Sequence, residues 1–112
     1  MQYMMLIIGD ESRFNTDPGI EPNREFAAYA EALRKAGVMK GGDRLYPTQR
    51  SKRVSVREGK TRVIDGPYAD TREQVGGYFI LECKDDAEAV AYAERCPAAR
   101  YGTIEIRPIV PR

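Results

Sequence analysis

The chain has 112 residues, with 18 Lys and Arg against 17 Asp and Glu, and it contains no histidine. This length and near-neutral charge are typical of a single domain over residues 1–112. The missing histidine excludes His-activated nucleophiles and His-ligated metals, and a Cys-only zinc site built from two cysteines would need another chain. We therefore predict no metal and no cofactor.

No apolar run approaches the ~18 residues that a membrane span needs, and the N-terminus lacks the regions of a signal peptide. We therefore predict a cytoplasmic protein that does not associate with membranes. Cys83 and Cys96 lie inside apolar patterns, which favours two reduced, half-buried thiols over the alternative of a disulfide.

The first predicted element is a strand over residues 3–8, apolar at odd and even positions and therefore buried on both faces. Residues 9–22 have no periodicity and are rich in Gly, Pro, Asn and Asp, which predicts a long loop. This loop is either a surface excursion or a lid over a binding site. Asn23 then caps a helix that ends at Gly37, and the apolar stripe of this helix is Phe26, Tyr29, Ala30 and Leu33.

Between residues 41 and 73 the apolar pattern shortens to period two, which predicts a β-hairpin with at least one exposed face. Val54 and Val56 alternate with polar residues in its first strand. Glu58-Gly59-Lys60 forms the turn, and Val63-Ile64 lies in its second strand.

A second strand that is apolar at both parities is predicted over residues 75–83. An acidic cap at Asp85-Asp86 then begins a helix over residues 86–96, whose apolar stripe is Ala89, Val90, Ala93 and Cys96. In the last predicted strand, residues 103–109, apolar and polar residues alternate. The order β-α-β-β-α-β with an extra hairpin predicts an α+β domain of the ferredoxin-like topology.

That topology makes residues 3–8 and 75–83 the two central strands, in agreement with their apolar character on both faces. Two helices cover only one side of such a sheet, so the other side needs a different cover. A second copy of the same sheet is the economical solution. We therefore predict a two-fold homodimer whose open sheets close into a shared α+β barrel.

One segment carries a recognisable motif. Residues 65–73 read Asp-Gly-Pro-Tyr-Ala-Asp-Thr-Arg-Glu, and Gly76-Gly77-Tyr78 follows. The segment resembles the signature of the DGPF branch of the YCII-related proteins, approximately Asp-Gly-Pro-Phe-Ala-Glu-Thr-Lys-Glu followed by Gly-Gly-Tyr. The opening residues 1–9, the Arg95-Cys96-Pro97 helix end and residues 104–108 match too, so the resemblance spans nearly the whole chain.

The resemblance implies a dimeric α+β barrel and a mostly unassigned function. YCII-related proteins are suspected enzymes because some of them carry a His-Asp pair in a cleft, and this chain departs from that pattern because it has no histidine. Proteins of the DGPF branch are also often associated with extracytoplasmic-function sigma factors, which implies a context linked to transcription.

Asp65 is the candidate catalytic residue, because it lies where a strand ends and a tight turn begins. Its alternative role is structural, since Asp before Gly-Pro accepts backbone N–H bonds in an Asx-turn. As an acid or base it would need a neighbouring carboxylate, and Glu73 or Glu105 is the candidate neighbour.

The candidate ligand-binding residues are Tyr68, Glu73, Tyr78, Glu105 and Arg107. The two tyrosines either bind ligand or pack in the core or in an interface. Glu105 and Arg107 share one face of the last strand, where they form an ion-paired edge or Arg107 binds a carboxylate or phosphate through its planar fork.

Residues 44–62 carry seven Lys and Arg against Glu58 alone. This segment is either a solvated edge that blocks aggregation or a surface for an acidic partner. Nucleic acid is disfavoured, because the whole chain is nearly neutral and Tyr46 is the single aromatic residue in the segment.

Two functions remain open from the sequence. In the first, a cleft of the dimer, lidded by residues 10–22, binds a small anionic metabolite or acts on it as an enzyme. In the second, the dimer is a non-enzymatic interaction module, linked to transcription, that presents its basic hairpin to a partner.

Overall fold

The structure is a computed structural model that describes residues 1–11, 21–69 and 71–112, with the backbone alone for residues 21–23. Four strands form an antiparallel sheet in the order β2-β5-β1-β6. They are β1 (Gln2–Asp10), β2 (Met39–Arg44), β5 (Glu73–Glu82) and β6 (Thr103–Pro108). The predicted central strands are therefore confirmed as β1 and β5. The predicted lid falls mostly on residues 12–20, which lie outside the described part of the chain.

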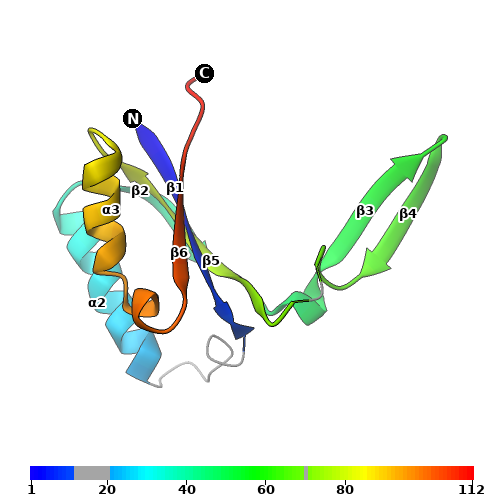
Figure 1. Cartoon of the computed structure of the whole chain (residues 1–112), viewed down its shortest axis with the longest axis horizontal. Helices are drawn as coiled ribbons and strands as arrows, with labels where there is room; N and C mark the ends of the chain where they lie inside the picture. The colour runs from blue at the N-terminus through cyan, green and yellow to red at the C-terminus, as the bar shows by residue number, and fades with distance from the viewer. Residues whose placement is uncertain (12–20, 70) are drawn as a thin grey trace.

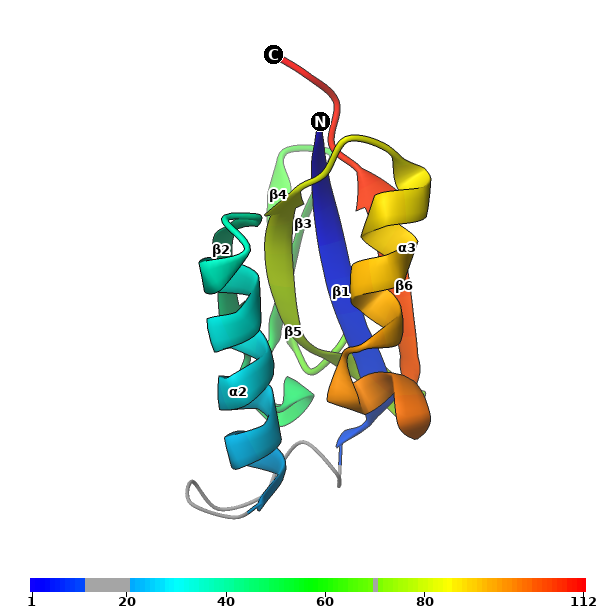
Figure 2. The same cartoon turned by 90° about the vertical axis from the view of Figure 1, so that its left-hand side faces the viewer.

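Helices α2 (Glu21–Lys35) and α3 (Asp86–Glu94) pack on the same face of the sheet (Figure 1). Seen from the helix side, α2 lies over the β2 side and α3 over the β6 side (Figure 2). The core lies between these layers, where Tyr3, Met5 and Leu81 are almost completely buried. Tyr29 of α2 packs edge to face on Phe79 of β5, with the ring centroids 5.8 Å apart.

Among the strands that the structure describes, β3 (Lys52–Arg57) and β4 (Lys60–Asp65) pair only with each other and form a separate two-stranded sheet. We call residues 52–65 the arm. Its turn, Glu58-Gly59, has φ of 53° and 76°, the left-handed pair that suits a two-residue hairpin. The arm projects from the sheet on the side opposite the helices (Figures 1 and 2). The radius of gyration is 15.7 Å, against about 13 Å for a compact domain of this length.

The predicted α+β class and the extra hairpin are thus confirmed, and the sheet is antiparallel. Gly37 also ends α2 as predicted, because its φ is 74° and the amide of Val38 reaches back to the carbonyl of Leu33. The predicted start of this helix is wrong. Asn23 lies inside α2, which is already helical at Glu21, so Asn23 is not the cap.

Helix α3 begins where the acidic cap predicts, since the carboxylate of Asp85 accepts the backbone N–H of Glu88 at 2.9 Å. It ends two residues earlier than predicted. Pro97 then begins the 3₁₀ helix η2 (Pro97–Arg100). Val90 does not belong to the buried stripe, because it is 49% exposed.

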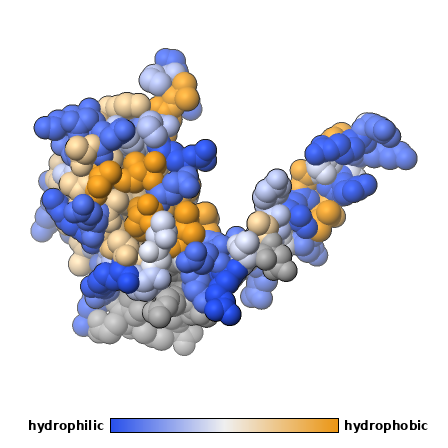
Figure 3. All heavy atoms as spheres, in the orientation of Figure 1, coloured by the Kyte–Doolittle hydropathy of each residue, from blue (hydrophilic) through white to orange (hydrophobic). Residues whose placement is uncertain are grey.

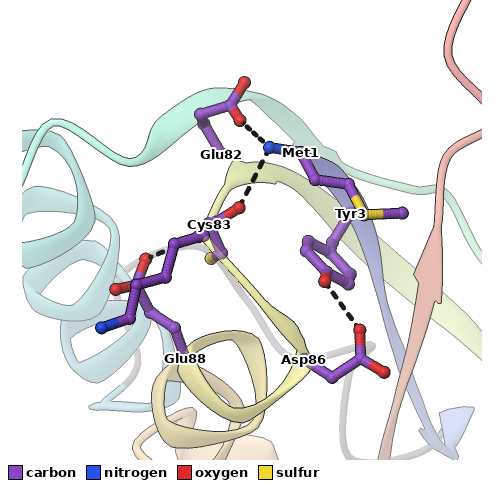
Figure 4. A network of polar contacts seen from close by, with 7 residues as sticks. Met1, Tyr3, Glu82, Cys83, Asp86 and Glu88 are labelled. Atoms are coloured by element: carbon purple, nitrogen blue, oxygen red, sulfur yellow. Dashed lines mark hydrogen bonds and ion pairs between the residues drawn. The ribbon is translucent and has the colours of Figure 1, made fainter.

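A polar network links the start of β1 to the end of β5 and to α3 (Figure 4). The Met1 ammonium group donates to the carboxylate of Glu82 and, at 3.1 Å, to the carbonyl of Cys83. The hydroxyl of Tyr3 donates to Asp86 at 2.7 Å. These bonds hold the edge of the core where β1, β5 and α3 meet.

No helix in residues 21–69 and 71–112 is long and apolar enough to cross a membrane.

Candidate functional site

The face of the sheet that the helices leave uncovered is the candidate site, and we call it the open face. Side chains alternate along each strand, so Tyr3, Met5 and Ile7 lie under the helices while Met4 and Leu6 lie on the open face. In the described chain these open-face residues are half-buried. The prediction that both central strands are buried on both faces is therefore wrong for a single protomer.

The register builds two rows of side chains across the open face. In the first row, Leu6 of β1 lies between Tyr78 of β5 and Glu105 of β6, and Asp43 of β2 pairs with Tyr78. The second row is Gly41, Ile80, Met4 and Arg107, in the same strand order. The middle strands thus contribute mainly apolar groups, while polar groups gather toward both edges.

Each edge has its own polar pair. At the β2 edge, the hydroxyl of Tyr78 donates to Asp43 at 3.3 Å. At the β6 edge, the Nε of Arg107 lies 3.3 Å from a carboxylate oxygen of Glu105. This is the ion-paired edge, one of the two alternatives that the sequence leaves open. Because both side chains are exposed, the guanidinium keeps donors for a further anion.

Three of the predicted site residues, Tyr78, Glu105 and Arg107, are therefore brought onto one face. Asp65 is not among them. It ends β4 at the root of the arm, its side chain is 77% exposed, and it forms an ion pair with Lys52 at 2.5 Å. Within one protomer, neither Glu73 nor Glu105 is its partner.

Tyr68 lies in the return segment, by which we mean the residues that connect the arm to β5, and Glu73 is the first residue of β5. Tyr68 is 92% exposed, so it does not pack in the core of this chain. Glu73 is exposed and pairs in register with Asp10 at the end of β1.

The motif at residues 65–73 forms the return segment. Gly66, at φ 103°, donates its N–H to Ser51 across the root of the arm. The side chain of Gln74 donates to the carbonyls of Ala69 and Thr71 at 2.7 and 3.1 Å. The motif therefore has a structural role in the described chain, where it sets the path between the arm and the sheet.

Both cysteines are free, as predicted, and they are buried rather than half-buried. Burial raises the pKa of Cys83 and of Cys96, so neither thiol is an activated nucleophile. Burial also raises the pKa of Tyr29, whose hydroxyl donates to the carbonyl of Tyr92 at 2.7 Å. The hydrogen bond to Asp86 is the main cause that raises the pKa of Tyr3 to about 12. These four groups lie in the core on the helix side of the sheet rather than on the open face.

Two shallow depressions occur outside the open face. One lies between α2 and η2, where Arg100 pairs with Glu25 at 2.6 Å. The other lies between α3 and β6 and is lined mainly by apolar groups, including Val90, Ile104 and Ile106; apolar atoms gather there (Figure 3). Among the residues that the structure describes, no three His, Cys, Asp or Glu side chains cluster as metal ligands.

Sequence reasoning predicted a second apolar face of the sheet that needs a cover, but it did not name the apolar residues of that face as site residues, and it missed Asp43 of β2. Met4, Leu6 and Ile80 are visible in the sequence as apolar residues of the central strands. Asp43 is not, because β2 contains Gly41-Gly42 and no alternating pattern. The contact between Asp43 and Tyr78 depends on the pairing of β2 with β5, which no local signal encodes.

A family model of the YCII-related domain matches residues 1–112. An uncharacterised protein of Rhizobium meliloti (strain 1021) is 30% identical over 114 residues, which cover 97% of this chain and 92% of that protein. A solved structure with a similar fold is 5-chloro-2-hydroxyhydroquinone dehydrochlorinase of Burkholderia phenoliruptrix, in complex with 2,5-dihydroxybenzoquinone. Its TM-score is 0.54 at 14% identity, and the match covers 98% of this chain and 94% of that one. At this identity the match shows a shared fold.

Proposed function

The chain belongs to the YCII-related domain family, and we propose that it binds a small anionic ring compound between two copies of its open face. The observation that carries this proposal is the composition of that face. Apolar residues of β1 and β5 occupy its middle, and Arg107 and Tyr78 lie toward opposite edges.

The uncovered apolar surface supports the dimer. Met4, Leu6 and Ile80 form a continuous apolar area on strands that are central in the sheet. Surfaces of this kind on small domains mark interaction sites. A second copy, related by a two-fold axis, would remove the area from water and place two copies of each polar edge around one enclosed space.

The polar edges support the class of ligand. A guanidinium recognises a carboxylate or an acidic hydroxyl through parallel N–H donors. The apolar middle of the face suits a flat hydrocarbon ring. The solved structure of similar fold binds 2,5-dihydroxybenzoquinone, a ring compound with hydroxyl and carbonyl oxygens, which has the same combination of an apolar body and a polar rim.

Catalysis by Asp65 stays a prediction. The carboxylate belongs to the root of the arm and is paired with Lys52 in one protomer. It would join the ligand only if the dimer brings the arm of one copy to the face of the other. Tyr68, in the return segment, and Glu73, at the start of β5, depend on the same condition.

The first experiment measures dimerisation by analytical ultracentrifugation and binding of 2,5-dihydroxybenzoquinone by calorimetry. Arg107→Gln is the test variant, and Arg100→Gln is its matched control. Both arginines are exposed and ion-paired, but Arg100 lies on the helix side with Glu25. Exposed pairs contribute about 0–1 kcal/mol, so both variants should fold.

We expect a dimer at micromolar concentration. Arg107→Gln should weaken binding about tenfold or more, because it removes a charge-assisted bond, and Arg100→Gln should leave binding unchanged. A monomeric mass for the wild-type chain would overturn the proposal. Equal affinities of the two variants would overturn the role of the open face as the ligand site.

A further inference from the structure

The arm has two chemically different faces. Residues directly opposite each other in an antiparallel pair project to the same side. Val54 pairs with Val63 and Val56 pairs with Thr61, so these residues share one side, which we call the valine face. The other side, which we call the basic face, carries Arg53, Ser55, Arg57, Lys60, Arg62 and Ile64.

The valine face is open to solvent in a single protomer. Val54, Val56 and Val63 are 64%, 56% and 58% exposed. In the described part of the chain, most of the exposed large apolar side chains lie between residues 45 and 68: Leu45, Tyr46, Val54, Val56, Val63, Ile64 and Tyr68. Along the arm, apolar atoms alternate with hydrophilic ones (Figure 3).

An uncovered arm of this kind is poorly stabilised. A two-stranded hairpin is at best marginally stable in water by itself, and this one pairs with no strand of the main sheet. Exposed valines add no stability until another surface removes them from water. The arm therefore needs a partner surface to hold the conformation that the structure shows.

We propose that the arm is a clasp that grips a second copy of this chain through its valine face. This inference rests on the proposed function in one respect, since its partner is the same second copy. It adds a second contact surface, distinct from the open face, and assigns a role to the basic hairpin.

Charge complementarity identifies the partner. Residues 44–62 hold seven of the 18 Lys and Arg and one of the 17 Asp and Glu, so the rest of the chain holds 11 basic and 16 acidic residues. A strongly basic segment is thus attached to an acidic body. Its complement is available on every other copy of the chain, and rim charges of opposite sign would steer the arm onto it.

The direction in which the arm projects also supports a second copy as the partner. The arm leaves the sheet on the side of the open face and away from both helices (Figures 1 and 2). A second copy seated on the open face would occupy the side toward which the arm projects. The clasp is therefore continuous with the proposed dimer surface.

The test compares Val54→Thr/Val63→Thr with the control Ile64→Thr. Threonine keeps the β-branched shape that strands favour and replaces one methyl group with a hydroxyl. The control also introduces a threonine, on the basic face, where a hydroxyl replaces the ethyl branch of Ile64. We expect the dissociation constant of the dimer to rise about tenfold or more for the valine-face variant, and to change less than about twofold for the control.

A separate variant, Leu6→Glu, distinguishes this inference from the proposed function. Leu6 lies in the middle of the open face, so a charge there should disrupt face-to-face packing. Loss of the dimer in Leu6→Glu with no effect of Val54→Thr/Val63→Thr would overturn the clasp and leave the proposed function intact. The opposite pattern would support the clasp and overturn the face-to-face dimer.

Cross-linking provides a readout that does not depend on how well a variant folds. A carbodiimide joins lysines to carboxylates that lie in contact. In a mixture of light and isotope-labelled wild-type copies, we expect mixed cross-links from Lys52, which lies on the same side of the arm as Val54 and Val63, to acidic residues of the other copy. Lys52 links found only within single copies, or arms that remain free and instead capture an added nucleic acid, would overturn the clasp.

Discussion

Thr48 binds the carboxylate of Glu11 with two hydrogen bonds. Its backbone N–H donates to one oxygen at 2.6 Å, and its hydroxyl donates to the other at 2.7 Å. Glu11 directly follows β1, and Thr48 begins the 3₁₀ helix η1 (Thr48–Arg50), which leads into the arm. One side chain thus fixes the root of the arm to the end of a central strand.

Glu11→Ala should loosen that root. Hydrogen bonds to a charged group contribute about 1.5–3 kcal/mol, so we expect the free energy of unfolding in urea to fall by about this amount. Trypsin should cleave the arm, which is rich in Lys and Arg, faster than in the wild type. Thr48→Val, which keeps the backbone bond, should give a smaller effect. Equal cleavage rates for wild type and Glu11→Ala would contradict this role.

Gly42→Ala should destabilise the sheet, whereas Gly41→Ala should not. A Cβ at residue 42 would lie 2.7 Å from the backbone oxygen of Tyr78 and from a ring carbon of Phe79, while a Cβ at residue 41 meets nothing closer than 3.8 Å. We expect a loss of about 2 kcal/mol or more for Gly42→Ala and less than about 0.5 kcal/mol for Gly41→Ala. Urea unfolding of the two variants measures the difference, and similar losses would show that β2 shifts easily.

The hydrogen bond of the N-cap residue Asp85 stabilises the start of α3. Asp85→Ala removes the acceptor for the N–H of Glu88, and should lower the free energy of unfolding by about 1 kcal/mol. Asp85→Asn keeps an acceptor at the same place and should retain most of the stability. Thermal unfolding followed by circular dichroism compares the two. An equal loss would assign the effect to the charge of Asp85 rather than to its hydrogen bond.

Stability should fall at alkaline pH, partly through Tyr3. The hydrogen bond to Asp86 and burial raise its pKa from 10.0 to about 12 in the folded chain. The folded state therefore favours the neutral phenol, so its contribution is complete below about pH 10 and is lost as the pH rises toward about 12. Tyr3→Phe should be less stable than the wild type near neutral pH, but its stability should fall less steeply above about pH 10. Urea unfolding across this range measures both slopes, and parallel curves would rule out this contribution.

The sequence predicted those parts of the fold that local patterns encode. The runs at residues 3–8 and 75–83 predicted the two central strands, Glu58-Gly59 predicted the turn of the arm, and Asp85 predicted the start of α3. Each of these signals depends on a few neighbouring residues. The predicted start of α2 is wrong: Asn23 suits a cap, but its low helix propensity is a weak signal, and the helix already begins at Glu21.

The candidate site was only partly predictable because register decides which residues meet. Glu105 and Arg107 are two residues apart, so their shared face follows from strand periodicity alone. Their alignment with Leu6 and Tyr78 requires the pairing of three strands. The place of Asp65 between a strand end and a tight turn predicts a site residue, yet the register of the hairpin pairs it with Lys52.

The Glu58-Gly59 turn lies at the free tip of the arm, far in the hairpin register from the bonds at its root. Residues inserted beside the turn would therefore extend the arm without altering the sheet. Two residues added to each strand would lengthen its reach by about 7 Å and leave every existing side chain on its present face. Arm length is thus an independent variable in this fold, which evolution or an engineer can change to span a wider or narrower gap.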